Sequence, residues 1–193
     1  MIENRYRDVA NLHIRSMQHG FLPSLGENFL ALLYRSIDES DHGILITHYE
    51  EGSLLGFVSG TTSMRSIYRS IFRSPWKLLN SLFPVLFSYS KLVKIFEIFR
   101  HTKSNRRQSL PDAELLSISV EANAKGSGVA SSLYKQLIRE FETRRVKEFV
   151  IVVGQQLDRA NAFYKKMGAT NEDFISVHRS SHSLIYIQKI DRG

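Results

Sequence analysis

Residues 115–130 of this chain read LLSISVEANAKGSGVA, and this stretch decides the fold. Over residues 115–120 apolar side chains alternate with serines, which is typical of a half-buried strand. Gly126 and Gly128 interrupt that pattern. From Val129 onward apolar residues recur every four positions, as they do on one face of a helix. The stretch therefore predicts a strand, a glycine turn and a helix, in that order.

The turn between this strand and this helix has the composition of an anion-binding loop. Glycines let the backbone approach an anion closely, and the first N–H groups of a helix have no partner within the helix and lie at its positive end. Lys125 adds a positive charge. The lysine precedes the glycines, which excludes a Walker loop, and Ser131 replaces the third glycine of a dinucleotide fingerprint. Residues 125–130 are a candidate phosphate or pyrophosphate cradle, and a plain tight turn is the alternative.

A second motif follows a second strand. Residues 146–153 are largely apolar, which predicts a strand buried on both faces. Residues 160–168 read ANAFYKKMG and predict a short helix. Asp158 is positioned to cap this helix, and Gly168 is positioned to end it.

Together, the two motifs resemble those of the GNAT superfamily of N-acetyltransferases. Where that family has Gln/Arg-x-x-Gly-x-Gly/Ala, residues 123–128 read NAKGSG. Where it has Asn-x-x-Ala-x-x-Phe-Tyr-x-x-x-Gly-Phe, residues 157–169 read LDRANAFYKKMGA. The resemblance extends over residues 112–190. The positions that depart from the family pattern are Asn123, Leu157 and Ala169.

The resemblance implies an α/β fold of the α+β type. We expect a mixed, mostly antiparallel central sheet flanked by helices, in a single domain over residues 1–193. A basic helical insertion at about 63–110 would precede the strand that the family counts as its fourth. Apolar patterning elsewhere predicts helices over 7–19 and 29–37, a hairpin of strands over 44–48 and 54–59, and closing strands over 174–177 and 184–190.

The resemblance also implies an acetyl-CoA-dependent N-acyltransferase, in which a primary amine of a small molecule or amino sugar attacks the thioester directly. Acetyl-CoA would be the acyl donor, in a V-shaped opening between the strands at 115–120 and 146–153, and no metal is expected. Residues 21–26 would line the acceptor side. An acyl-CoA-binding sensor without catalysis is the alternative function. The expected cofactor contacts are Ile118, Ser119, Val120, Lys125, Gly126, Ser127, Gly128, Val129, Ala130 and Asn161.

Two residues are expected to carry the chemistry. Tyr164 would protonate the departing thiolate, as the family's tyrosine does, and simple packing of its helix on the sheet is the alternative. Glu114 is the candidate general base, because strict alternation along its strand places it on one face with Leu116, Ile118 and Val120. A carboxyl group on an apolar face has a raised pKa, which suits a base near neutrality. A solvated Glu114 is the alternative, and His178 or His182 could then serve as base.

The composition excludes several classes of protein. The chain contains no cysteine, which excludes a disulfide scaffold, thiolate zinc and iron–sulfur sites and a cysteine nucleophile. No apolar run follows the first charged residues, so no signal peptide is expected. The most apolar stretch, 78–99, contains charged residues and a proline, so no membrane-spanning helix is expected either. We expect a cytoplasmic protein, with peripheral contact at the inner membrane surface as a variant of that expectation.

The positive charge of the chain is concentrated in the insertion. Residues 65–107 contain ten Lys or Arg and one acidic residue, in a chain whose net charge is +7. Arg65, Arg69 and Arg73 recur every four residues among apolar side chains, as in a basic amphipathic helix. Binding of nucleic acid is disfavoured because the segment is so apolar. The pattern favours a helical lid or a homodimer contact, and it leaves a membrane-surface role open.

Overall fold

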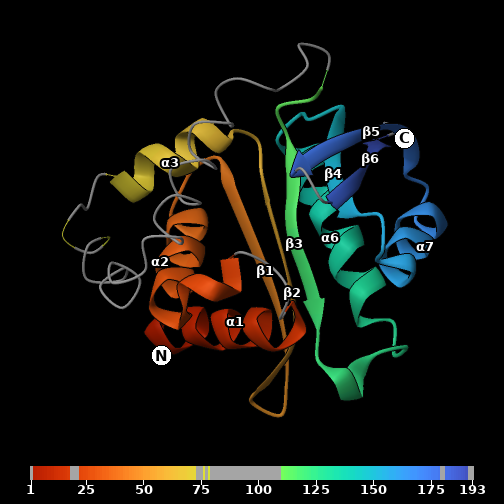
Figure 1. Cartoon of the computed structure of the whole chain (residues 1–193). Coiled ribbons are helices and arrows are strands. Elements are labelled where there is room, and N and C mark those ends of the chain that lie inside the picture. Colours follow the sequence, from red (N-terminus) through yellow and green to blue (C-terminus); the bar gives the residue numbers. More distant parts are fainter. Residues whose placement is uncertain are drawn as a thin grey trace.

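The computed structural model describes residues 2–17, 22–72, 76, 78, 110–178 and 181–190 (Figure 1). Most of the insertion, from residue 79 to residue 109, lies outside these ranges. The elements, in chain order, are α1 (Ile2–Ser16), η1 (Leu22–Leu25), α2 (Glu27–Asp38), β1 (Gly43–Glu50), β2 (Ser53–Thr61), α3 (Met64–Phe72), β3 (Glu114–Val120), η2 (Ala122–Ala124), α6 (Val129–Thr143), β4 (Glu148–Gly154), α7 (Asp158–Lys166), β5 (Thr170–His178) and β6 (Ser181–Lys189).

The strands form one six-stranded sheet in the order β1-β2-β3-β4-β6-β5. Neighbouring strands are antiparallel except β3 and β4, which are parallel. Helices α1, α2 and α3 cover one face of the sheet, and α6 and α7 lie on the other (Figure 1). The expected mixed, mostly antiparallel sheet flanked by helices is confirmed, and β3 is the strand that the family counts as its fourth.

Each face of the sheet has its own apolar core. The α1–α3 face buries the residues around Phe57, and the α6–α7 face buries those around Leu137 and Phe149. On the second face, α6 packs directly on the backbone of β2. A Cβ at Gly60 would lie 2.9 Å from Leu137 Cδ1 and from Phe141 Cζ, so a side chain there would push the helix away. This close packing fixes α6, and with it the start of the helix, relative to β3.

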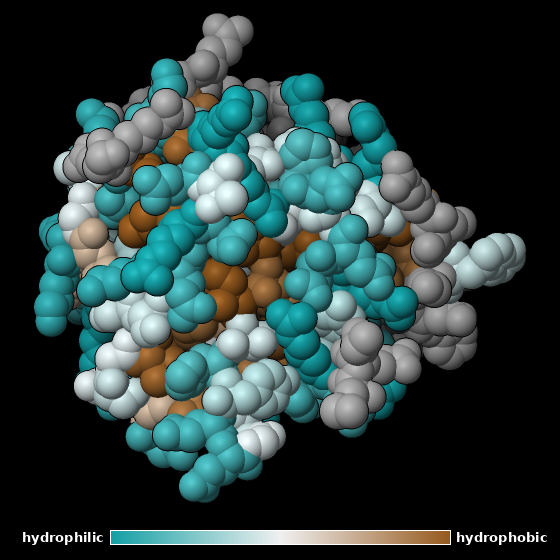
Figure 2. All heavy atoms as spheres, turned by 180° about the vertical axis from the view of Figure 1, so that it is seen from behind, coloured by the Kyte–Doolittle hydropathy of each residue, from teal (hydrophilic) through white to brown (hydrophobic). Residues whose placement is uncertain are grey.

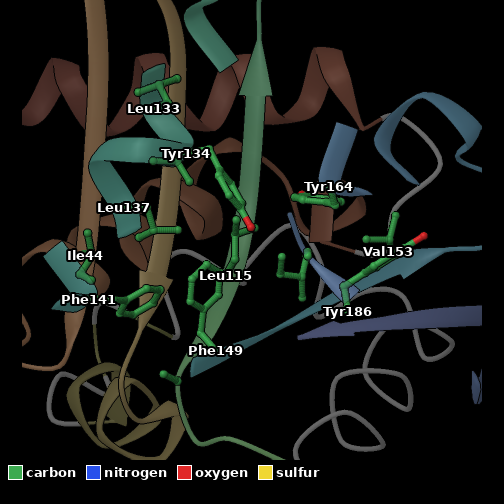
Figure 3. Packing of buried hydrophobic residues seen from close by; sticks show 14 of the residues in the cluster. Ile44, Leu115, Leu133, Tyr134, Leu137, Phe141, Phe149, Val153, Tyr164 and Tyr186 are labelled. Carbon is green, nitrogen blue, oxygen red and sulfur yellow. The ribbon is translucent and has the colours of Figure 1, made fainter. Parts of the chain in front are cut away.

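The surface is mostly hydrophilic, as expected when most apolar side chains are buried in the two cores. In Figure 2, hydrophilic side chains cover most of the face that is turned to the viewer, and apolar atoms are visible between them in a band across its middle and in smaller patches around it. Figure 3 shows the cluster on the α6–α7 face, where side chains from two helices and several strands meet. Packing between elements therefore accounts for most of the apolar sequence that the structure describes.

The boundaries of the elements refine the sequence predictions. Helix α1 begins at Ile2, before the predicted start, while α2 and the β1–β2 hairpin lie where they were expected. The prediction that Asp158 caps α7 is wrong, because Leu157 occupies the N-cap and Asp158 is the first helical residue. Gly168 does follow the end of that helix, with φ +92°.

Candidate active site

Strands β3 and β4 part soon after they begin. They pair only through Glu114 with Val150 and Leu115 with Ile151. Beyond these positions β4 pairs with β6, and β3 stays paired with β2. Val152, which follows the last residue of β4 that pairs with β3, is 41% exposed. Within the described residues the pairing of β3 with β4 thus ends where the family resemblance implies a V-shaped opening.

The backbone of β3 lines one side of this opening. The Glu121 N–H donates to the Leu55 carbonyl oxygen at 2.8 Å. Because hydrogen-bonded and non-bonded pairs alternate in an antiparallel ladder, Ser119 also bonds toward β2. The N–H and C=O groups of Ile118 and Val120 then point toward the edge that β4 has left. These are the backbone positions where the sequence predicts contacts with the donor.

A bulge in β3 separates Glu114 from these residues. Ser59 pairs with Ser117 but Gly60 pairs with Leu115, so Leu116 is an extra residue. Ile118 pairs with Val58, which belongs to the core on the α6–α7 face. Glu114 pairs with Thr61, which is the neighbour of Gly60 in β2. Because Gly60 faces α6, Thr61 faces the other side of the sheet. Strand alternation therefore places Glu114 on the α1–α3 face.

The expected common face of Glu114, Ile118 and Val120 is thus wrong. The physical reason is that a bulge adds one residue to one strand and reverses the alternation beyond it. Glu114 lies at the closed end of the opening, on the opposite side of the sheet from the start of α6. Its carboxyl group is half-buried there.

The glycine turn has the geometry of an anion-binding loop. Gly126 and Gly128 have φ values of +86° and +92°, which disfavour any residue with a side chain. A Cβ at either position would meet nothing within 4 Å, so the space beside this backbone is open. No side chain caps α6. The N–H groups of Val129, Ala130 and Ser131, in the first turn of α6, therefore have no partner within the helix.

Two other residues of the turn have distinct roles. The Ser127 hydroxyl donates to the Ala124 carbonyl oxygen at 2.7 Å, and the Ser127 N–H donates to the same oxygen at 3.3 Å. Ser127 thus closes the turn, and its N–H is already bonded. The side chain of Lys125 is exposed at the edge of the turn, where an ammonium group can approach a phosphate.

Tyr164 lies among aromatic side chains on the α6–α7 face. Its ring centroid is 5.9 Å from that of Tyr134 and 6.2 Å from that of Tyr186 (Figure 3). Burial raises the pKa of its hydroxyl, so the phenol is protonated at neutral pH. Every fully buried side-chain oxygen or nitrogen among the described residues has a hydrogen-bond partner, yet none is found there for the Tyr164 hydroxyl. The Tyr164 side chain is 5% exposed.

Asn161, for which contact with the cofactor stays a prediction, forms side-chain hydrogen bonds within the protein. Its Nδ2 donates to the carbonyl oxygens of Gly154 and Gln155, each at 3.2 Å, and its Oδ1 accepts from the Tyr186 hydroxyl at 3.1 Å. The side chain is buried. Asn161 thus positions the loop between β4 and α7, and its amide is occupied by the protein itself.

The α1–α3 face contains a buried polar pair that the sequence motifs did not indicate. His13 Nδ1 is hydrogen-bonded to the Tyr34 hydroxyl, and the imidazole stacks on Phe57 at 6.3 Å. Both side chains are at most 2% exposed. Phe57 pairs with Ser119 of β3, so this pair lies next to the strand that lines the opening. His13 follows the buried Val9 by four residues, and that spacing is the signal that could have identified it.

His13 should make the protein sensitive to mild acid. Burial lowers the pKa of His13 from 6.5 to about 4. Between these values the unfolded chain binds a proton that the folded chain does not, so the free energy of unfolding falls as the pH drops from 6.5 toward 4. The full loss is about 3 kcal/mol, at 1.36 kcal/mol per pKa unit. Urea unfolding at several pH values should show this slope in the wild type and a shallower one in His13→Gln, and equal slopes would contradict the expectation.

Some of the other candidates fall partly outside the described residues. The side chains of His178 and His182 lie outside them, as does Phe21 of the expected acceptor segment. The remainder of that segment forms η1 and the turn after it, and its Leu25 packs against Phe29 of α2. Within the described residues no group of three or more His, Cys, Asp or Glu side chains could hold a metal ion. Over the same ranges, no helix has both the length and the apolar character needed to cross a bilayer.

Comparisons with known proteins agree with this geometry. The sequence model of the acetyltransferase (GNAT) family matches residues 7–169. A GNAT-family acetyltransferase from Desulfovibrio desulfuricans aligns with a TM-score of 0.62 at 9% identity, over 97% of this chain and 94% of that one. An aminoglycoside 6'-N-acetyltransferase complexed with coenzyme A aligns with a TM-score of 0.61 at 10% identity, over 97% and 92%. The ribosomal-protein-S18-alanine N-acetyltransferase from Escherichia coli aligns with a TM-score of 0.52 at 13% identity, over 87% and 79%.

A search of curated proteins finds no match to the sequence. At these identities the solved structures establish the shared fold, and the family match, which spans most of the chain, establishes membership. The parted strands and the glycine turn lie within the matched residues. The family uses acetyl-CoA as its acyl donor. The chain therefore belongs to the GNAT family and is a GNAT-type N-acetyltransferase.

Proposed function

We propose that this enzyme acetylates a primary amine of a small molecule or amino sugar by direct attack on the thioester of acetyl-CoA. The observation that carries the proposal is the parting of β3 from β4 beside an uncapped glycine turn. This arrangement combines free backbone groups for an extended ligand with N–H groups for a phosphate. The proposal takes residues 1–193 as one domain acting in the cytoplasm, in keeping with the absence of cysteine.

The donor would be held mainly by backbone groups. The N–H and C=O groups of Ile118 and Val120 would bind the pantetheine amides. The first N–H groups of α6, with Lys125, would bind the pyrophosphate. Hydrogen bonds to charged groups contribute about 1.5–3 kcal/mol each, so a few of them supply most of the affinity. Backbone binding also explains why the departures at Asn123 and Leu157 leave the site usable.

The acceptor would approach from the α1–α3 face. Glu114 lies on that face, where it would take the proton that the attacking ammonium group loses, directly or through a water. An N–H of β3 would stabilise the oxyanion. Tyr164 lies on the other face and would donate its proton to the departing thiolate. The sheet thus separates the base from the acid, and the gap between β3 and β4 connects them.

The acceptor is selected by side chains around the opening and not by the fold. An aminoglycoside acetyltransferase and a protein acetyltransferase share this fold, so the fold itself does not select the acceptor. The second candidate function is an acyl-CoA sensor without turnover. It is favoured by the position of Glu114, which the bulge places on the opposite face of the sheet from Ile118 and Val120.

Donor binding and turnover should be measured separately. We expect acetyl-CoA to raise the melting temperature of the full chain by several degrees, because a ligand at 100 times its Kd stabilises the folded state by about 2.7 kcal/mol. We expect release of the CoA thiol to rise above its basal rate with at least one member of a panel of amino sugars and small amines. A thermal shift without thiol release on any amine would favour the sensor, and the absence of both would contradict the proposal.

A further inference from the structure

Helix α3 begins the basic insertion, and its inner side belongs to the core. Ile67 and Ile71 are 0% and 2% exposed and pack in the cluster on the α1–α3 face. Tyr68 and Leu78 pack against the same cluster. This half of the helix fits the helical lid that the sequence favours, because its apolar side chains are covered by the protein itself.

The outer side of the helix is different. Arg65 and Arg69 are exposed, Phe72 is 52% exposed and Trp76 is 78% exposed. Arg65, Arg69 and Phe72 follow one another at helical spacings of four and three residues, so they lie along one side. Trp76 lies four residues beyond Phe72 in the sequence and is also helical. We call these four residues the α3 surface.

The α3 surface combines two features of proteins that bind at the membrane interface. Basic residues are attracted to anionic lipid headgroups, and tryptophan is enriched at the level of those headgroups. Neither Arg65 nor Arg69 forms an ion pair with an acidic group among the described residues. The sequence from 65 to 107 adds eight further Lys or Arg and only one acidic residue. The charges of Arg65 and Arg69 and the exposed ring of Trp76 can therefore contact a partner.

The positive charge of the α3 surface indicates which of three partners it binds: a second copy of the chain, a nucleic acid or a bilayer. A symmetric contact with a second copy would bring two copies of this positively charged surface together, and like charges repel. A nucleic acid would also match the positive charge. It would gain less binding energy here, because the residues next to the arginines are apolar. An anionic bilayer matches the arginines through its headgroups and accepts Phe72 and Trp76 into its interfacial layer.

We propose that the α3 surface is a peripheral docking site for an anionic phospholipid bilayer. Arg65 and Arg69 lie at the phosphate level, and Phe72 and Trp76 enter the boundary between headgroups and acyl chains. The protein binds on the membrane without crossing it. This proposal does not depend on the acetyltransferase reaction, since it concerns a different surface.

Flotation of the full chain with vesicles tests the proposal. Vesicles of phosphatidylglycerol and phosphatidylcholine should carry the wild type with them, and vesicles of phosphatidylcholine alone should not. The double variant Arg65→Glu/Arg69→Glu should bind the anionic vesicles at least about tenfold more weakly. The matched control is Lys135→Glu/Arg139→Glu, which reverses two exposed charges at the same spacing on α6 and should bind as the wild type does.

Tryptophan fluorescence gives a second measurement of vesicle binding. It is made on the wild type, so it does not depend on whether a variant folds. Trp76 is the one tryptophan in the sequence, so its emission reports on this surface directly. Anionic vesicles should shift that emission to the blue, and lipids brominated near the headgroup should quench it. Equal flotation of the wild type and the Arg65/Arg69 variant, or an unshifted emission, would overturn the proposal. So would dimerisation without vesicles that the same variant abolishes, or tighter binding to RNA than to vesicles.

Discussion

Replacement of Tyr164 by phenylalanine should lower kcat by about 10²- to 10⁴-fold, the usual contribution of a general acid. The Kd for acetyl-CoA should change by less than about twofold. The ring stays in its aromatic cluster, so packing is retained and only the hydroxyl is lost. Because no hydrogen bond to this hydroxyl is found among the described residues, its loss should leave the free energy of unfolding nearly unchanged. Thiol release with an accepted amine, together with calorimetry of acetyl-CoA binding, measures both quantities.

The matched control is Tyr134→Phe, which removes a hydroxyl from a neighbouring ring of the same cluster. The Tyr134 hydroxyl donates to Gln188 Oε1 at 2.9 Å, so its loss should cost about 1–3 kcal/mol of stability. It should leave kcat within a few fold of the wild type. If Tyr164→Phe turns over as fast as Tyr134→Phe, Tyr164 is a packing residue and another group protonates the thiolate.

Replacement of Gly126 by glutamate should abolish detectable binding of acetyl-CoA, with a loss of at least about 100-fold in affinity. The new carboxylate would carry the same sign of charge as the pyrophosphate and would project from the backbone that should bind it. The displaced hydrogen bonds are charge-assisted, and losing two of them at about 1.5–3 kcal/mol each gives a loss of this size. Calorimetry with acetyl-CoA measures the effect.

Gly52→Glu is the matched control for this variant. Gly52, in the turn between β1 and β2, has φ +78°, and a Cβ there would also meet nothing within 4 Å. Both variants place a charged side chain on a residue whose backbone is in the left-handed region, so they share that cost in stability. They differ in whether the residue belongs to the proposed pyrophosphate site. Gly52→Glu should bind acetyl-CoA as the wild type does. Tight binding by Gly126→Glu would mean that the pyrophosphate lies elsewhere.

The local elements around the site could be predicted from the sequence because their causes are local. The alternation in residues 115–120 and the four-residue spacing after Val129 depend only on side-chain period. The positive φ values at Gly126 and Gly128 depend on the absence of a Cβ. Neither property requires knowledge of a distant residue, so strand, turn and helix lie where the pattern places them.

The face of Glu114 could not be predicted in this way. It depends on how β3 pairs with β2, and one extra residue at Leu116 reverses every side chain beyond it. The role of Asn161 likewise depends on the Tyr186 hydroxyl, which a different strand supplies. His13 meets Tyr34 only because α1 packs on α2.

The sequence by itself determined the order of the elements, the glycine turn at the start of α6 and the location of the positive charge. The tertiary structure decided which side of the sheet each polar group occupies and which apolar residues of α3 are covered. The physical reason is that periodicity and backbone conformation are properties of neighbouring residues. Register, burial and hydrogen-bond partners are instead set by contacts between segments far apart in the chain.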